Sequence, residues 1–445
     1  MKIHCSHRHR KIFFIILMVL FALVLLDQYV GTCYRAVRNT EFRSYQWDSE
    51  TLWELQPEFT GSAFGHIVHT NSAGFRGTEP LAPKSSNSFR IITFGDSRTY
   101  GIHVADQETF SHVLQTELKK QQIDAQVLNS GTPGYTAVQC LAKLKQLLKF
   151  QPDIAILAVG YNDRRYLVLT SPDSPENFRQ IAALRRGMQI LGISNIFFAI
   201  THELGSNALK KKLESPPPLD QVRVRVSPDR FSSSVEEFLL LCKKNGIQPL
   251  LLKIPQNPLV FVPVEQAYAL YKQQQYTEAI SLLKEKQPEL HVAAQAFAHY
   301  TMGVCYRALN DESQAQKHFK AHSPLGSLHG ESVLRPQAEY LERSQKLAEK
   351  YSVPVLDAQE YILKINEYLS NSEIHSLLDE VEAADFPLVD GTTPLHRENG
   401  KILNLENFLH ARYTDECHFD ALGHALIGKG LSVEILNLLD ISHRK

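Results

Sequence analysis

A single serine follows a short apolar run at a point where the chain turns. The run 89–94 (FRIITF) leads into Gly-Asp-Ser, which places Ser97 directly after a predicted strand. Gly, Asp and Ser are ordinary turn residues, so a simple turn is one interpretation. A serine held at a strand end can also act as a nucleophile, provided that a base, an orienting acid and donors for an oxyanion accompany it.

A base and an acid occur together near the end of the chain. In the stretch TDECHFDALGH, Asp415 stands three residues before His418, so its carboxylate can reach the imidazole from one turn. Asp415 would fix the imidazole tautomer while His418 accepts the proton of Ser97. The alternative is a metal site made of Asp415, Cys417, His418 and His424, which lacks a recognisable ligand spacing. We therefore predict a triad of Ser97, His418 and Asp415, with no metal and no other cofactor.

Donors for an oxyanion are also available. Gly134, in NSGTPGYT, offers a backbone N–H where a side chain would crowd a substrate, and Ser97 offers its own N–H. Asn162, in GYND, offers a side-chain amide, although Asn162 and Asp163 could simply cap a helix. We predict an oxyanion hole formed by Ser97, Gly134 and Asn162.

These residues must be positioned by a sheet. Unbroken apolar runs alternate with helical patterns, which is typical of a parallel sheet covered on both faces. In such sheets, sites form at the carboxyl ends of the strands, and Ser97, Gly134 and Asn162 all lie just past predicted strand ends. The predicted strands are 89–94, 125–128, 154–159, 247–255 and 353–357, and the predicted helices are 108–121, 137–150, 233–245 and 337–351.

Four sequence blocks, in this order, resemble the SGNH hydrolases, also called the GDSL family. Ser97 in FGDSRTYG matches the first block, Gly134 in NSGTPGYTA the second, Asn162 in GYND the third, and Asp415 with His418 in DECH the last. The lead-in NSAGFRG is similar to membrane-tethered bacterial members. The resemblance covers roughly residues 71–255 and 353–436.

This resemblance implies a three-layer α/β/α fold with a flavodoxin-like parallel sheet and a serine esterase or deacylase. It implies an O-acyl or O-acetyl ester of a cell-envelope glycan or lipid as substrate. Two alternatives stay open: an O-acyltransferase in which a sugar hydroxyl replaces water, and an envelope scaffold with a vestigial hydrolase core. Arg98 departs from the family, which commonly has a hydrophobic or small residue after the nucleophile. We expect Arg98 either to bind acidic substrates or to hold a polar loop.

The N-terminus predicts a membrane anchor. Lys2, Arg8, Arg10 and Lys11 precede the uncharged apolar run 12–26, which reaches nineteen residues if it continues to Val30. A cleaved signal peptide or a lipoprotein site at Cys33 would begin similarly, but the cleavage signals are poor. We expect one uncleaved helix, with the basic side in the cytoplasm and the bulk of the chain outside it.

Residues 265–321 differ from the rest of the chain. The stretch AYALYKQQQYTEAISLL recurs in outline as GVCYRALNDESQAQKHF, so that Ala267 matches Gly303 and Ala279 matches Ala315. This resembles tetratricopeptide repeats, with an unrelated pair of amphipathic hairpins as the alternative. We expect paired antiparallel helices that could bind a protein partner.

The composition is sufficient for a large hydrophobic core and does not indicate a nucleic-acid-binding protein. The 445 residues include 47 basic and 48 acidic side chains, and no basic run follows the first residues. The six cysteines form no CxxC pair, so we expect buried free thiols. We divide the chain into a cytoplasmic tip with its anchor (1–31), a lead-in segment (32–88), the first part of the hydrolase core (89–260), a helical insert (261–330) and the C-terminal part of the core (331–445). Residues 171–222 receive no role.

Overall fold

The structure is a computed structural model. It describes residues 7–37, 44–85, 88–165, 172–190, 196, 200, 223–290, 292–328, 337–368, 370, 372, 397–398, 401–402, 405, 409, 412–415 and 417–443.

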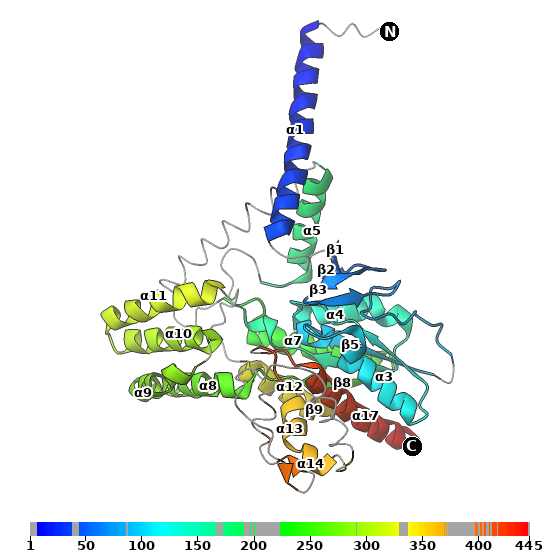
Figure 1. Ribbon diagram of the computed structural model, residues 1–445, viewed down its shortest axis with the longest axis vertical. Coiled ribbons are helices and arrows are strands. Elements are labelled where there is room, and N and C mark those ends of the chain that lie inside the picture. The colour runs from blue at the N-terminus through cyan, green and yellow to red at the C-terminus, as the bar shows by residue number, and fades with distance from the viewer. Residues whose placement is uncertain are drawn as a thin grey trace.

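A parallel sheet forms the centre of the molecule (Figure 1). Its spatial order is β6-β5-β7-β8-β9, the 2-1-3-4-5 order of flavodoxin-like sheets. This arrangement confirms the predicted α/β class and its five strands. The strands are β5 (Phe89–Gly95), β6 (Ala125–Asn129), β7 (Ile154–Ala158), β8 (Gln248–Lys253) and β9 (Val355–Asp357).

Helices cover both faces of this sheet because successive strand residues point to opposite sides. Ile91 and Ile156 belong to the core on one face, whereas Ile92 and Leu157 belong to the core on the other. Each such fully buried aliphatic side chain contributes about 1.5–3 kcal/mol. The first face is covered by α3 (Phe110–Lys120) and α17 (Ala421–His443), and the second by α4 (Ala137–Leu147), α7 (Pro228–Lys244) and α12 (Ala338–Tyr351).

Local signals explain where these helices begin. The Thr109 side chain accepts a hydrogen bond from the His112 N–H at the start of α3. Ser227 caps α7 in the same way, and Pro228 occupies its first position, where a missing N–H costs nothing. Besides the lead-in strands, the paired helices of the insert and the N-terminal helix, the remaining elements are α2 (Ser97–Tyr100), η2 (Asp106–Glu108), η3 (Leu148–Phe150), η4 (Asn162–Arg164), α5 (Pro175–Ile190), η6 (Gln287–Glu289), α13 (Ala358–Leu363), α14 (Ile365–Tyr368), β10 (Arg397–Glu398) and β11 (Lys401–Ile402).

The lead-in segment contains strands that the sequence analysis did not predict. It contains two antiparallel hairpins, β1 (Tyr45–Asp48) with β2 (Leu52–Leu55) and β3 (Thr60–Ala63) with β4 (His66–His69). The first hairpin turns over Asp48, whose carboxylate accepts hydrogen bonds from the N–H groups of Glu50 and Thr51. This Asx-type turn has no glycine, so the usual hairpin signal is absent from the sequence.

Four helices form the insert, to one side of the sheet (Figure 1). They have a core of their own, in which Ala267, Ala279, Ala315 and Phe319 are fully buried. Gly303 lies against the Phe319 ring, where an added Cβ would stand only 2.4 Å from a ring carbon. The predicted paired helices are therefore confirmed, whereas the tetratricopeptide assignment stays a prediction. The helices are α8 (Pro258–Lys272), α9 (Tyr276–Lys286), α10 (Val292–Ala308) and α11 (Glu312–Leu328).

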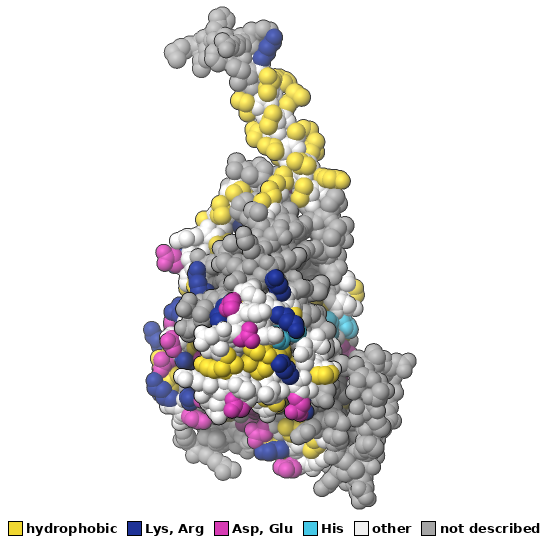
Figure 2. Space-filling model, turned by 90° about the vertical axis from the view of Figure 1, so that its left-hand side faces the viewer, with side chains coloured by type: hydrophobic (Ala, Val, Ile, Leu, Met, Phe, Trp, Pro, Cys, Tyr) yellow, Lys and Arg dark blue, Asp and Glu magenta, His cyan; other side chains and the backbone are white. Residues whose placement is uncertain are grey.

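The N-terminal helix α1 (His7–Val37) projects away from the rest of the molecule (Figures 1 and 2). Its window Phe14–Gly31 is long and apolar enough to cross a membrane, and its apolar side chains from Phe14 to Leu26 are largely exposed. A secretion signal has the same features. The second apolar helix, α17, is instead mostly buried in the core.

The cysteines agree with the prediction where they are described. Free, buried thiols are present at Cys140, Cys242, Cys305 and Cys417. Cys5 lies outside the described residues, as does the side chain of Cys33.

Candidate active site

The turn after β5 places Ser97 at the carboxyl edge of the sheet. Asp96 caps the short helix α2, and its Oδ1 accepts a hydrogen bond of 3.0 Å from the Arg98 N–H. Gly95 is required here, because an added Cβ would stand 2.1 Å from Thr99 Oγ1 and 2.6 Å from the Ala158 carbonyl oxygen. The turn and the serine therefore form one rigid unit.

His418 and Asp415 reach this serine from the C-terminal part of the chain. His418 Nε2 lies 2.7 Å from Ser97 Oγ, and His418 Nδ1 lies 2.6 Å from Asp415 Oδ2. Because a carboxylate can only accept, Nδ1 carries the proton and Nε2 is left to accept from the serine hydroxyl. The structure thus brings together the three residues of the predicted triad, across 321 residues of sequence.

A tight turn before α17 holds Asp415 in place. Its Oδ1 accepts the backbone N–H groups of Cys417 and His418, each at 2.8 Å. Burial alone would raise the pKa of Asp415, but interactions with the side chains of His103 and His418 outweigh it and hold the pKa well below its usual value. Asp415 is therefore a carboxylate at neutral pH, as an orienting acid must be.

Of the predicted oxyanion donors, Ser97 begins α2, Gly134 lies on the loop 130–136 and Asn162 lies on η4. The Thr132 N–H donates to the Gly95 carbonyl oxygen at 3.0 Å, which ties this loop to the nucleophile turn. Gly134 has a φ of +82°, a conformation that favours glycine. Within the part of the chain that the structure describes, the backbone N–H groups of Ser97 and Gly134 have no acceptor.

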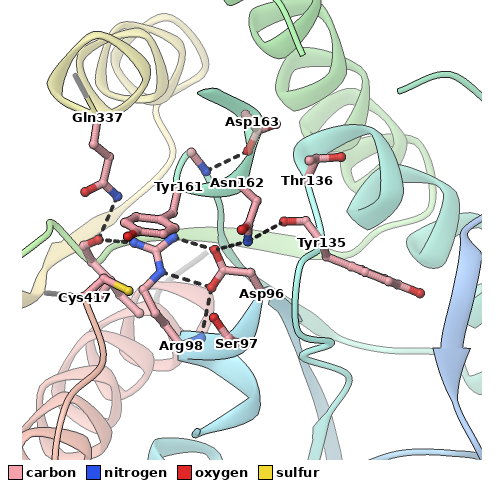
Figure 3. A network of polar contacts seen from close by, with 12 residues as sticks. Asp96, Ser97, Arg98, Tyr135, Thr136, Tyr161, Asn162, Asp163, Gln337 and Cys417 are labelled. Atoms are coloured by element: carbon pink, nitrogen blue, oxygen red, sulfur yellow. Dashed lines mark hydrogen bonds and ion pairs between the residues drawn. The ribbon is translucent and has the colours of Figure 1, made fainter. Parts of the chain in front are cut away.

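Asn162 lies closer to Asp96 than the sequence suggests. Its Nδ2 donates to Asp96 Oδ2 at 3.3 Å and to the Tyr135 carbonyl oxygen at 3.2 Å (Figure 3). Both amide hydrogens therefore have acceptors, and both bonds are long. The amide links the nucleophile turn to the loop 130–136.

Arg98 does not face the nucleophile. Its guanidinium is almost fully buried, pairs with both oxygens of Asp96 at 2.7 and 3.0 Å, and donates to the Ile254 carbonyl oxygen (Figure 3). Burial alone would lower the pKa of Arg98, but Asp96 outweighs it and raises the pKa. Gln337 donates to the same carbonyl at 3.0 Å, and the guanidinium lies over the Tyr161 ring. This burial and these partners favour the expectation that Arg98 holds a polar loop, and the predicted contact with acidic substrates stays a prediction.

His103 is a residue of the site that the sequence did not single out. Its Nε2 lies 3.6 Å from Asp415 Oδ2, and its ring meets the His418 ring edge-on at 5.8 Å. The side-chain nitrogens of His103 and His418 and a carboxylate oxygen of Asp415 lie within 4.8 Å of one another. His424, from the alternative metal set, lies apart on α17, where its Nδ1 accepts the Phe110 N–H at 3.2 Å. The only sequence signal for His103 is its place six residues after the serine.

An arginine of the lead-in segment fixes the backbone next to the site. Arg76 Nε pairs with Asp106 Oδ1 at 2.9 Å, and its terminal nitrogens donate to the carbonyl oxygens of Tyr100 and Val104, each at 2.6 Å. Arg76 belongs to the stretch NSAGFRG. It therefore fixes the chain that leads from the nucleophile helix to His103.

Comparison with known proteins supports an ester-hydrolase site. Residues 93–219 match the model of the GDSL-like Lipase/Acylhydrolase family, and this range contains Ser97, Gly134 and Asn162 but ends before Asp415. A search of curated proteins found no significant match.

Solved structures with similarity include a lipase/acylhydrolase from Enterococcus faecalis (13% identity, 78% of this chain and 95% of that chain, TM-score 0.32). A GDSL-like lipase from Bacteroides thetaiotaomicron is also similar (10%, 80% and 92%, TM-score 0.32). A catalytic mutant of an acetylxylan esterase from Geobacillus stearothermophilus is a third (11%, 79% and 96%, TM-score 0.33). These TM-scores are low, so nothing about function rests on these three structures.

Proposed function

We propose that the chain is an SGNH/GDSL-type hydrolase that acts on esters. Ser97, His418 and Asp415 would remove O-acyl groups, above all O-acetyl groups, from a glycan or lipid of the cell envelope. The observation that carries the proposal is the unbroken chain of contacts from Asp415 through His418 to Ser97, at 2.6 and 2.7 Å. A scaffold with a vestigial hydrolase core would not require these three side chains to be hydrogen-bonded to one another.

The proposed reaction proceeds through an acyl-enzyme. Ser97 Oγ attacks the ester carbonyl carbon while His418 Nε2 takes the hydroxyl proton. The tetrahedral intermediate collapses, and His418 gives that proton to the oxygen of the departing alcohol. Water then repeats the sequence, with His418 as base, and releases the acid and the free serine.

The negative oxygen of each tetrahedral intermediate needs donors. The N–H groups of Ser97 and Gly134, which have no acceptor among the described residues, supply two of them. We propose that Asn162 supplies the third by sharing the hydrogen that now makes its longer bond, 3.3 Å to Asp96. Asn162→Ala should then lower kcat by about 10²–10³-fold with a smaller change in KM, the usual cost of losing one such donor.

We further propose that α1 anchors the enzyme in a membrane, with the hydrolase outside the cytoplasm. The support is the exposed apolar surface of α1 together with basic residues, such as Lys11, that precede the apolar window Phe14–Gly31. Release of a soluble form that begins near residue 33 would show instead that the segment is a cleaved signal. An enzyme held in this way would meet esters of the cell envelope.

The substrate proposal is tested by product analysis. Purified full-length protein in detergent is incubated with an O-acetylated glycan, an acetyl ester of p-nitrophenol and a long-chain ester, and free acid is measured. Acetate release from the first two, absent in Ser97→Ala, is the expected result. Transfer of acetyl to an added sugar at the expense of free acetate would favour the O-acyltransferase, and release only from the long-chain ester would contradict O-acetyl specificity.

A further inference from the structure

A tryptophan side chain forms a hydrogen bond with the peptide group that carries the Gly134 N–H. Trp53 Nε1 donates a hydrogen bond of 3.1 Å to the Pro133 carbonyl oxygen. Pro133 C=O and Gly134 N–H belong to one planar trans peptide, in which the two groups point in opposite directions. Fixing the direction of the carbonyl oxygen on one side of the C–N bond therefore fixes the direction of the N–H on the other side.

Further contacts show that Trp53 is locked to this loop. Its own carbonyl oxygen accepts the Tyr135 hydroxyl at 2.5 Å. The edge of its indole lies against Gly134, where an added Cβ would stand 3.1 Å from Trp53 Cζ2. The next carbonyl, that of Gly134, accepts from Arg225 at 2.7 Å. A glycine at φ +82° has wide conformational freedom, so these external contacts decide which way its N–H points.

The hairpin that carries Trp53 is itself fastened to the hydrolase core. The Gln139 side chain, on α4, donates to the Thr51 carbonyl oxygen at 2.7 Å, and Lys143 pairs with Glu54 at 2.7 Å. The lysine side chain is only 10% exposed, so this pair is screened less than a surface pair would be. Trp53 thus stands on a rigid support, although it lies outside the residues 93–219 that match the family model.

We propose that Trp53 is a positioning residue for the oxyanion hole, through its hydrogen bond to the Pro133 carbonyl. This inference rests on the proposed function, because it assumes that the Gly134 N–H meets the oxyanion. The bond does two things: it orients the peptide, and it polarises the peptide so that its N–H becomes a stronger donor. The lead-in segment then contributes directly to transition-state stabilisation and is more than a spacer between membrane and enzyme.

The test removes the indole N–H and keeps an aromatic ring against Gly134. We expect Trp53→Phe to lower kcat for a p-nitrophenyl acetyl ester by about tenfold with KM nearly unchanged, less than the loss of a complete oxyanion donor. The rate of phosphonylation of Ser97 by a fluorophosphonate should fall in parallel, because its transition state also places a negative oxygen in the hole. The matched control is Trp47→Phe, since Trp47 is exposed and is the direct cross-strand partner of Trp53.

A closer isostere guards against misfolding of Trp53→Phe. The chain has two tryptophans, so in the Trp47→Phe background a tryptophan analogue enters only at position 53. β-(3-Benzothienyl)alanine has the shape of tryptophan but no N–H. Its incorporation should reproduce the tenfold loss of kcat with only a small fall in Tm, in line with the loss of one hydrogen bond to a rigid loop.

The outcomes separate this inference from the proposed function. Two forms of the Trp47→Phe protein are compared, one with tryptophan and one with benzothienylalanine at position 53. Equal kcat in the two forms would overturn the role of Trp53, and so would a change confined to KM. Absence of phosphonylation at Ser97 in the wild-type protein would instead overturn the proposed function itself. If the wild-type protein is phosphonylated at Ser97 and the benzothienylalanine variant keeps its kcat, only the inference about Trp53 is contradicted.

Discussion

The Nε2 atom of His103 lies 3.6 Å from Asp415 Oδ2, the same oxygen that His418 Nδ1 contacts at 2.6 Å. The triad acid therefore faces two imidazoles. His103 also has a φ of +69°, in the left-handed region that a residue with a Cβ rarely adopts. A strained residue beside a catalytic acid indicates that the side chain has a role at that position.

His103→Gly should separate the strain from the role. Glycine removes a cost of about 1–2 kcal/mol for the left-handed conformation but adds unfolded-state entropy, so the net gain in unfolding free energy should be about 0.5 kcal/mol. We expect kcat to fall several-fold, because Asp415 loses one of its two partners. Urea unfolding and ester kinetics measure the two effects.

The matched control for this variant is Gln122→Gly. Gln122 is exposed and has a φ of +62°, and it lies at the end of α3, away from the triad. It should gain similar stability with no change in kcat. If His103→Gly also leaves kcat unchanged, His103 has no part in the site.

Arg98 is predicted to matter for stability and not for the choice of substrate. Arg98→Met leaves the Asp96 carboxylate buried without its partner, which should cost about 3–5 kcal/mol of unfolding free energy. Arg98→Lys keeps the charge but loses the two-pronged contact, so its cost should be smaller. The ratio of kcat/KM for an acetyl ester to that for an acidic hemisuccinate ester should be the same in Arg98→Lys and the wild type. A selective loss of the acidic ester would support the substrate-binding role.

His424 should control stability at acidic pH. Burial, followed by the charges of Arg76 and His418, lowers the pKa of His424 to about 3, so the folded protein keeps this imidazole neutral. The unfolded chain binds a proton near pH 6.5, and stability is therefore lost as the pH falls from about 6.5 toward 3, at up to about 1.4 kcal/mol per pH unit. His424→Asn keeps an acceptor for the Phe110 N–H and should lose less stability on acidification.

Two measurements check this prediction. The free energy of unfolding is measured in urea at pH 7 and pH 5. Between these two values it should fall less for His424→Asn than for the wild type. Ester hydrolysis at pH 7 should persist in His424→Asn, whereas His418→Ala should abolish it. Parallel pH dependence in the two proteins would mean that His424 binds a proton as readily in the folded state as in the unfolded chain, so that its pKa is not lowered.

The helical insert is predicted to be separable from the chemistry. The insert has a hydrophobic core separate from the cores of the sheet. One chain of hydrogen bonds connects it to the hydrolase core: Glu265 on α8 accepts from Gln256 at 2.9 Å, and Gln256 accepts from the buried Arg164 at 2.7 Å. Replacing residues 265–321 with a Gly/Ser linker should leave Ser97 reactive toward a fluorophosphonate and toward small esters. It should weaken action on a polymeric substrate or the association with a membrane partner. A folded deletion protein whose Ser97 no longer reacts would show that the insert shapes the active site.

The sequence was most informative where a local pattern had one physical solution. Uninterrupted apolar runs such as 154–159 predicted the strands, because a strand buried on both faces has no polar side to display. The triad followed from residue types and order. The partners of each side chain could not be predicted, because they come from segments distant in sequence: Arg98 meets Ile254, and Trp53 meets Pro133. The hairpin carrying Trp53 was missed because its turn over Asp48 lacks glycine.

The most direct test of the account is the site of phosphonylation. Purified protein is treated with a fluorophosphonate, and the modified residue is identified by intact mass and peptide mapping. The hydrogen bond of 2.7 Å between His418 and Ser97 predicts a single adduct, on Ser97. The adduct should be absent from Ser97→Ala and formed at least ~10³-fold more slowly in His418→Ala, the usual cost of losing a triad member. An adduct on another residue, or equally fast labelling of His418→Ala, would contradict the proposed mechanism.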